Sequence, residues 1–297
     1  MGYKKNSNLS GKLADELKKT REEINIKNEF GTIPKSIMIF KKSKILMNLI
    51  ENDNQDFETE IRQKGTRGGG YAKNLKFSTY NPDQAEFIIK YYTRENDLIL
   101  DPFMGRTTRP IISLYYNRKY IGFDTCKKTC DFNLKLIEKK FGNSKNNDFT
   151  IINGDGTSMI SDLKDNSIDC VFTCPPYYDK EKYSGEEGDL SYISYEEFNK
   201  KMQQCFDILY KKIKKSIYKE KKFYPVIFTV GTIRQQDSGI FDMDFIFQNM
   251  AYKSGFILHD KLFTENLTPG AGYTFRRNYL YKFVTKNYET TLVFLKY

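Results

Sequence analysis

Short apolar runs alternate with segments of helical spacing from about residue 77 to the end of the chain. The runs are rich in branched and aromatic residues, a pattern that predicts buried strands. Strands that alternate with helices, such as those expected at 107–116 and 130–141, predict a doubly wound, mostly parallel α/β sheet with ligands at the carboxyl ends of its strands. The seven predicted strands are 98–103, 120–124, 149–155, 168–173, 224–230, 255–263 and 289–297.

Residues suited to chemistry directly follow four of these strands. They are the turn 101–106, Asp124, Asp155 and the run 174–178, which reads CPPYY. Because the carboxyl ends of parallel strands share one edge of the sheet, we expect all four to line a single crevice.

Residues 1–76 differ from the rest of the chain in composition and in the pattern of apolar residues. They are polar and mixed in charge, with a predicted helix at 13–24 and a glycine-rich end at 67–70. We therefore predict an N-terminal extension at 1–76 and one catalytic-type domain at 77–297.

Composition narrows the class of protein. The formal charge of +10 and the pI near 9.1 favour a nucleic-acid partner, although an AT-rich coding sequence would also enrich Lys, Asn and Ile. No apolar run is long enough for a membrane span and residues 1–10 lack a signal-peptide core, so we expect a soluble, intracellular (cytoplasmic) protein of bacterial, phage or viral type.

The cysteines and the histidine point away from metal chemistry. The pairs Cys126/Cys130 and Cys170/Cys174 have zinc-like spacing, but the second pair flanks an apolar strand. His259 has no second histidine to pair with, so we expect it to be structural and expect no metal site or hydrolytic triad.

The turn after the first strand, DPFMGRTT, has the character of a cofactor loop. Gly105 permits a tight turn, and the start of the next helix can face an anionic group. About twenty residues on, Asp124 ends the next strand, where a carboxylate can accept from two ribose hydroxyls. These features alone fit NAD, FAD or S-adenosylmethionine.

Taken together, the motifs resemble the DNA amino-methyltransferases that use S-adenosylmethionine. That family's first motif, Asp-Pro-Phe-x-Gly-x-Gly-Thr, is matched without gaps by 101–108, except that Thr107 replaces the second glycine. FSTYNP at 77–82, IGFD, NGD, CPPY and the closing strand match in order, so the resemblance covers 77–297. It implies a Rossmann-like methyltransferase sheet, an S-adenosylmethionine cofactor and these cofactor-binding residues: Phe77, Ser78, Asp101, Phe103, Gly105, Asp124 and Asp155.

The two prolines of CPPY gain a role from this resemblance. Prolines end the strand, and carbonyls freed from the ladder can accept from an exocyclic amino group and make its nitrogen more reactive. The expected catalytic group is Cys174, Pro175 and Pro176, with Tyr177 as a stacking face for a flipped base.

The target base is the main open choice. In the family, an acid before Pro-Pro mostly accompanies methylation of adenine N6, and a serine there mostly accompanies methylation of cytosine N4. Cys174 is closer to serine in size and charge, so we favour cytosine N4 over adenine N6. Other readings are carbon-five methylation by a Cys174 thiolate, an RNA or protein substrate, a nicotinamide oxidoreductase, and a nucleic-acid-binding relic without catalysis.

The resemblance makes double-stranded DNA the expected partner. Any restriction endonuclease would be a separate chain, and the protein would be a monomer or homodimer. Recognition is expected from 1–76 and the 262–279 loop. The residues expected to contact DNA are Lys211, Lys212, Lys214, Lys215, Arg276 and Arg277, although the lysines could instead be a solvated helix end.

Overall fold

A computed structural model gives the fold of the chain. It describes residues 35–40, 46, 49–50, 80–177, 185, 188–235, 239–265, 282 and 288–297, with no side-chain description for 233–239. The predicted helix 13–24 and four expected site residues (Phe77, Ser78, Arg276 and Arg277) lie outside this part of the chain.

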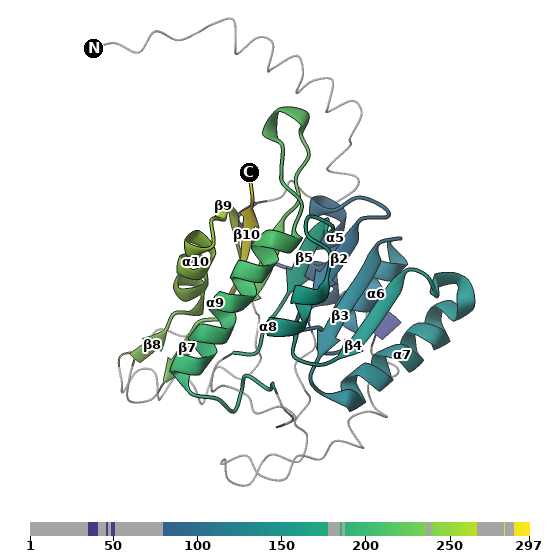
Figure 1. Cartoon of the computed structure of the whole chain (residues 1–297), viewed down its shortest axis with the longest axis horizontal. Coiled ribbons are helices and arrows are strands. Elements are labelled where there is room, and N and C mark those ends of the chain that lie inside the picture. The colour runs from purple at the N-terminus through teal and green to yellow at the C-terminus, as the bar shows by residue number, and fades with distance from the viewer. Residues whose placement is uncertain are drawn as a thin grey trace, which may run out of the picture.

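An eight-stranded sheet forms the centre of the described structure (Figure 1). Its order is β1-β9-β10-β6-β5-β2-β3-β4, and all neighbours pair in parallel except β10, which runs antiparallel to both β6 and β9. The mostly parallel α/β fold is confirmed, and all seven expected strands are present. The strands are β1 (Ile37–Met38), β2 (Leu98–Asp101), β3 (Lys119–Asp124), β4 (Phe149–Asn153), β5 (Cys170–Thr173), β6 (Val226–Val230), β9 (Ile257–Glu265) and β10 (Tyr288–Leu295).

Helices cover both faces of this sheet. Neighbouring strand residues point to opposite faces, so Ile99 and Phe172 pack in one core while Leu100 and Val171 pack in the other. Helices α5 (Pro82–Tyr92), α6 (Thr108–Tyr115) and α7 (Lys127–Phe141) cover the first face, and α9 (Tyr195–Lys212) and α10 (Met243–Lys253) the second. The remaining elements are α8 (Gly156–Met159), the 3₁₀ turns η2 (Gly142–Lys145), η3 (Ile160–Asp162) and η4 (Tyr218–Glu220), and the hairpin β7 (Ile233–Gln235)–β8 (Gly239–Phe241).

The strand order fixes where a ligand can bind. From β2 the chain moves outward to β3 and β4, and from β5 it moves the other way to β6. The order therefore reverses between β2 and β5, and a crevice opens at the carboxyl ends of such a pair. The side of the sheet formed by the carboxyl ends of the parallel strands is called the carboxyl edge below. The side formed by their amino ends is called the amino edge.

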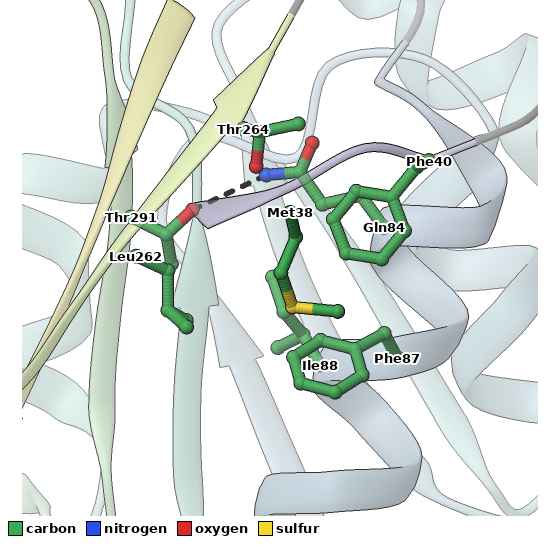
Figure 2. Close-up of a pocket in the computed structure, with 8 residues that line it drawn as sticks. All are labelled: Met38, Phe40, Gln84, Phe87, Ile88, Leu262, Thr264 and Thr291. Carbon is green, nitrogen blue, oxygen red and sulfur yellow. Dashed lines mark hydrogen bonds between the residues drawn. The ribbon is translucent and has the colours of Figure 1, made fainter. Parts of the chain in front are cut away.

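The described part of the N-terminal extension joins the same core. Met38 of β1 lies among Phe87 and Ile88 of α5 and Leu262 of β9, lining a crevice too narrow to admit a water molecule (Figure 2). Ile50 is also buried in this core. These residues pack as part of the main domain, and the boundary at 76/77 stays a prediction.

Within the described residues, none of the helices combines the length and the apolar character needed to cross a membrane.

Candidate functional site

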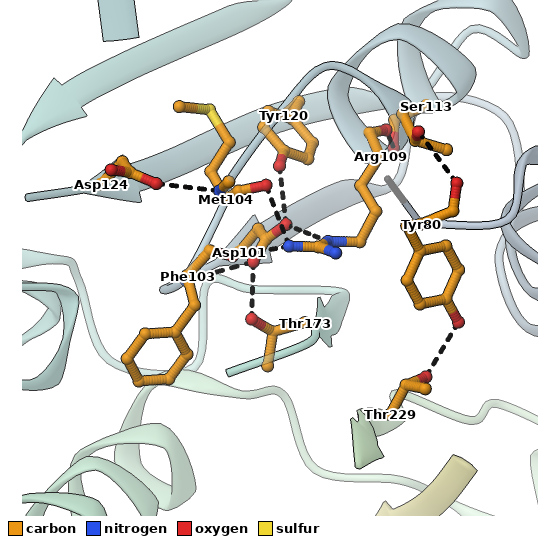
Figure 3. Close-up of polar contacts among 12 residues, drawn as sticks. Tyr80, Asp101, Phe103, Met104, Arg109, Ser113, Tyr120, Asp124, Thr173 and Thr229 are labelled. Atoms are coloured by element: carbon orange, nitrogen blue, oxygen red, sulfur yellow. Dashed lines mark hydrogen bonds and ion pairs between the residues drawn. The ribbon is translucent and has the colours of Figure 1, made fainter. Parts of the chain in front are cut away.

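Asp101, the last residue of β2, organises the floor of the crevice (Figure 3). Its Oδ2 accepts from Arg109 Nε at 2.6 Å and from the Tyr120 hydroxyl at 2.8 Å. Its Oδ1 accepts from Thr173 Oγ1 at 2.6 Å and from the Phe103 amide at 3.2 Å. A carboxylate has about four lone-pair sites, so this fully buried group is saturated by its own protein.

This saturation bears on one sequence expectation. Asp101 was expected to be a cofactor-binding residue, but its carboxylate has neither exposed surface nor spare acceptors, and its contact with the cofactor stays a prediction. It instead joins the ends of β2 and β5 through Thr173, which directly precedes the CPPY turn. Asp101 supports the site from beneath.

The loop after β2 is held in place by hydrogen bonds to its backbone. Arg109 of α6 donates to the carbonyls of Phe103 and Met104 at 2.5 and 2.9 Å. Asp124 accepts from the Gly105 amide at 3.0 Å. Gly105 has φ +56°, in the region that favours glycine, which explains its place in the turn. Phe103 is partly buried and packs at the border of the core beneath.

Asp124, which ends β3, keeps a partly exposed carboxylate beside this loop. It accepts from the amides of Gly105 and Cys126, one on each oxygen, and so retains lone pairs for a ligand. Burial raises the pKa of Asp124 to about 6, while those two amides pull it in the opposite direction. The position fits the predicted contact to a ribose.

Asp155 follows β4 and caps α8. Its Oδ1 accepts from the Thr157 amide at 2.8 Å and hydroxyl at 2.6 Å, and its Oδ2 forms an ion pair with Lys201 at 2.9 Å. The structure gives Asp155 the role of a helix cap, and its proposed contact with an adenine amino group would use the remaining lone pairs of the same carboxylate.

The CPPY turn leaves β5 next to the β2 loop. Tyr177 is partly exposed, and its hydroxyl lies 3.9 Å from Cys174 Sγ and donates to Glu289 Oε1 at 3.2 Å. A Cβ at Gly231, the residue after β6, would come within 2.9 Å of the Tyr177 ring, so a glycine here lets the backbone approach the ring closely. Burial raises the pKa of Cys174 to about 12, so the thiol is protonated at neutral pH.

Tyr80 and Glu289 are among the residues of this site that were not found from the sequence. Tyr80 donates to or accepts from Thr229 at 2.8 Å, and the Arg109 guanidinium lies 5.4 Å from its ring centre. Glu289 comes from β10, far along the chain from Tyr177. Tyr80 sits inside FSTYNP and Glu289 begins the closing strand run, so both were near quoted motifs, but neither carried a signal of its own.

Four of the lysines expected to contact DNA lie at the amino edge. Lys212 is buried and pairs with Asp165 at 2.7 Å, and Lys214 pairs with Asp169 at 2.5 Å. The helix α9 ends here, at the amino edge, and the segment after it projects on the side of the molecule where the C-terminus lies (Figure 1). Lys211 and Lys215 are exposed at that same edge. These four lysines therefore lie away from the crevice, and their contact with DNA stays a prediction.

A larger hollow, of about 290 Å³, also lies at the amino edge. Its lining includes Tyr91, Arg94, Tyr224 and His259. His259 stacks on Phe223 with ring centres 5.7 Å apart, in keeping with a structural role. This hollow lies at the opposite ends of the strands from Cys174 and Asp124.

Residues 3–135 match the model of a family described as DNA methylase. The resemblance to the DNA methylases, stated for 77–297, is thus confirmed where the two ranges overlap, at 77–135. The DNA methylase match contains the 101–108 turn and Asp124, and it ends before Asp155 and the CPPY turn. A curated relative, the Type II methyltransferase M2.LlaDCHI of Lactococcus lactis subsp. cremoris, is 39% identical over 66 residues, which are 22% of this chain and 23% of the relative.

Solved structures match the larger part of the chain at low identity. TrmN from Thermus thermophilus is 11% identical with a TM-score of 0.46, over 73% of this chain and 49% of that one. Phosphoethanolamine N-methyltransferase 2 from Haemonchus contortus is 14% identical with a TM-score of 0.44, over 72% and 52%. Neither likeness is strong enough to bear on function.

Proposed function

We propose that this chain is an S-adenosylmethionine-dependent DNA methyltransferase that methylates an exocyclic amino group of a flipped base, with cytosine N4 as the favoured target. The observation that carries the proposal is the joining of two parts at the switch point. The β2 loop, which lies within the DNA methylase match, and the CPPY turn are bridged by the 2.6 Å hydrogen bond from Thr173 to Asp101. Methyl donor and acceptor would meet across this bridge.

The residues beside the β2 loop fit the cofactor. Asp124 has lone pairs available for two ribose hydroxyls, Gly105 lets a ligand approach the main chain, and Phe103 offers a partly exposed ring. Asp155 would accept from the adenine amino group. When bound, S-adenosylmethionine supplies an electrophilic methyl group on a sulfonium.

The CPPY turn supplies the acceptor side. The Pro175 carbonyl would accept from the target amino group, since β5 ends at Thr173 and this carbonyl lies beyond the ladder. Tyr177 would stack on the base and offset the few kcal/mol needed to unstack it, by about 1–3 kcal/mol. Placing the amino nitrogen in line with the methyl group would supply most of the acceleration.

The protonation state of Cys174 supports this reading over carbon-five chemistry. A carbon-five enzyme needs a thiolate nucleophile, whereas the pKa of Cys174 is raised to about 12 and its thiol stays neutral. A neutral, weakly polar group before the prolines resembles the serine that accompanies cytosine N4. Cys174→Ser should therefore retain activity.

The deciding experiment is mass spectrometry of nucleosides from duplex DNA incubated with the protein and labelled S-adenosylmethionine. N4-methylcytosine supports the proposal in full. N6-methyladenine as the only product would retain the enzyme class and overturn the base assignment. Label found only in competing RNA or in protein would overturn the DNA substrate.

A further inference from the structure

The residue in place of the second motif glycine, Thr107, has an unusual conformation. Its φ is +29° and ψ −42°, a combination that a β-branched residue adopts only under strain. Its side chain is fully buried, and within the described part of the chain its hydroxyl makes no hydrogen bond. Thr107 by itself therefore works against the loop shape in which it is found.

Asn133 of α7 holds the loop in this strained conformation through hydrogen bonds to its backbone. Its Oδ1 accepts from the Thr107 amide at 3.0 Å, and its Nδ2 donates to the Gly105 carbonyl at 2.9 Å. The Nδ2 also donates to the Thr129 carbonyl at 2.9 Å, which fixes the amide to its own helix. One side chain, only 1% exposed, thus ties both ends of the tripeptide 105–107 to α7.

Only a primary amide of this length can make both contacts. Aspartate can accept from the Thr107 amide, but it has no proton to give the Gly105 carbonyl. Leucine fills a similar volume and makes neither bond. The pattern of donor and acceptor is therefore specific to Asn133.

The same glycine is held on its other side by Asp124. The Gly105 amide donates to Asp124 and the Gly105 carbonyl accepts from Asn133, so one peptide unit on each side is anchored. The two hydrogen bonds from Asn133 to the Thr107 amide and the Gly105 carbonyl are called the clamp below. Loss of the clamp would shift Gly105 relative to the Asp124 carboxylate, which is expected to hold the ribose.

We propose that Asn133 is a positioning residue that holds the cofactor loop in its binding shape, supplying through a side chain what a second glycine would supply through backbone freedom. This inference rests on the proposed function for the identity of the ligand, S-adenosylmethionine. It predicts that the need for Asn133 disappears when Thr107 becomes glycine.

The test is a double-mutant cycle on the full chain, using Asn133→Asp, Thr107→Gly and their combination. Calorimetry with S-adenosylmethionine should show about tenfold weaker binding for Asn133→Asp, equivalent to about 1.4 kcal/mol, and recovery of most of the loss in the double variant. The matched control is Asn147→Asp, the same change at an exposed site, with wild-type affinity expected.

A second readout does not depend on the ligand. Hydrogen exchange of the loop 103–108 in the free protein should be faster in Asn133→Asp and return toward wild type in the double variant. Unchanged exchange and unchanged affinity in Asn133→Asp, or no recovery with Thr107→Gly, would overturn the clamp. Absence of S-adenosylmethionine binding in the wild type, with the exchange pattern as expected, would overturn the proposed function and leave the clamp standing.

Discussion

Asp124 is the site carboxylate whose protonation depends most clearly on the fold. Its pKa is raised from 3.8 to about 6, so the folded chain holds this proton more tightly than the unfolded chain. Its contribution to stability is therefore fully present below about pH 4 and is lost as the pH rises through about 6. Ligand binding has the opposite dependence, because the ionised carboxylate is the better acceptor for ribose hydroxyls.

We predict that S-adenosylmethionine affinity rises about tenfold between pH 5 and pH 7, following ionisation of Asp124. Asp124→Asn should bind weakly and show little pH dependence in calorimetry over this range. Asp131→Asn, which removes a carboxylate of an exposed ion pair on α7, should keep the wild-type profile. A pH dependence that persists unchanged in Asp124→Asn would contradict the assignment.

Two substitutions of Tyr177 can separate the contribution of stacking from that of hydrogen bonding at the base site. Tyr177→Ala should weaken the complex with an extruded base by about 1–3 kcal/mol, because it removes the stacking face. Tyr177→Phe keeps the ring against Gly231 and loses the hydroxyl's contacts with Glu289 and Cys174, so it should cost much less. The measurement is the fluorescence of pyrrolocytosine, a cytosine analogue, at the target position in duplex DNA.

A matched control for this pair is Tyr252→Ala on α10, where the ring is half exposed and away from the crevice. It should leave the fluorescence response unchanged. Equal losses in Tyr177→Phe and Tyr177→Ala would mean that the hydroxyl network, rather than stacking, holds the base.

At the level of elements, Arg109 couples α6 to the loop before it. Its guanidinium is 5% exposed and serves both the Asp101 carboxylate and two loop carbonyls. Arg109→Met would leave the buried Asp101 charge without its cation, and we expect a loss of about 3–5 kcal/mol in the free energy of unfolding by urea. Arg94→Met, at an exposed site, should cost little; a loss below about 1 kcal/mol at Arg109 would show that the pair is dispensable.

The elements were largely predictable because their signals are local. Branched and aromatic runs marked the seven strands, and the turn residues after them marked the carboxyl edge. The two-residue strand β1 was missed, since its pairing with β9 depends on a contact between distant parts of the chain. Glu289 and Asn133 were missed for the same reason: each acts through a partner that sequence spacing does not bring near. Lys212 and Lys214 looked like a basic patch, but their acidic partners lie on other segments.

At the level of the whole molecule, exposed lysines lie at both the amino and the carboxyl edge of the sheet. Lys211 and Lys215 are exposed at the amino edge. At the carboxyl edge, Lys128 lies in the first turn of α7, shortly after Asp124, and Lys200 precedes Lys201, the partner of Asp155. DNA whose base reaches the CPPY turn must lie over the carboxyl edge, so phosphate contacts are expected from that side. Arg276 and Arg277, outside the described residues, remain predicted contacts.

We predict that Lys128→Glu with Lys200→Glu weakens duplex binding and reduces the slope of log affinity against log salt by roughly 2, about 0.9 for each lost phosphate contact. Lys211→Glu with Lys215→Glu makes the same change in net charge at the opposite edge and should leave the slope unaltered. Fluorescence anisotropy across a salt series measures both. Because the two double variants carry equal net charge, a general electrostatic effect would lower their affinities for DNA alike. A difference between the two affinities therefore requires that DNA binds at one edge of the sheet. Greater loss from the amino-edge pair would place the DNA on the far side of the sheet and make base transfer into the CPPY turn geometrically untenable.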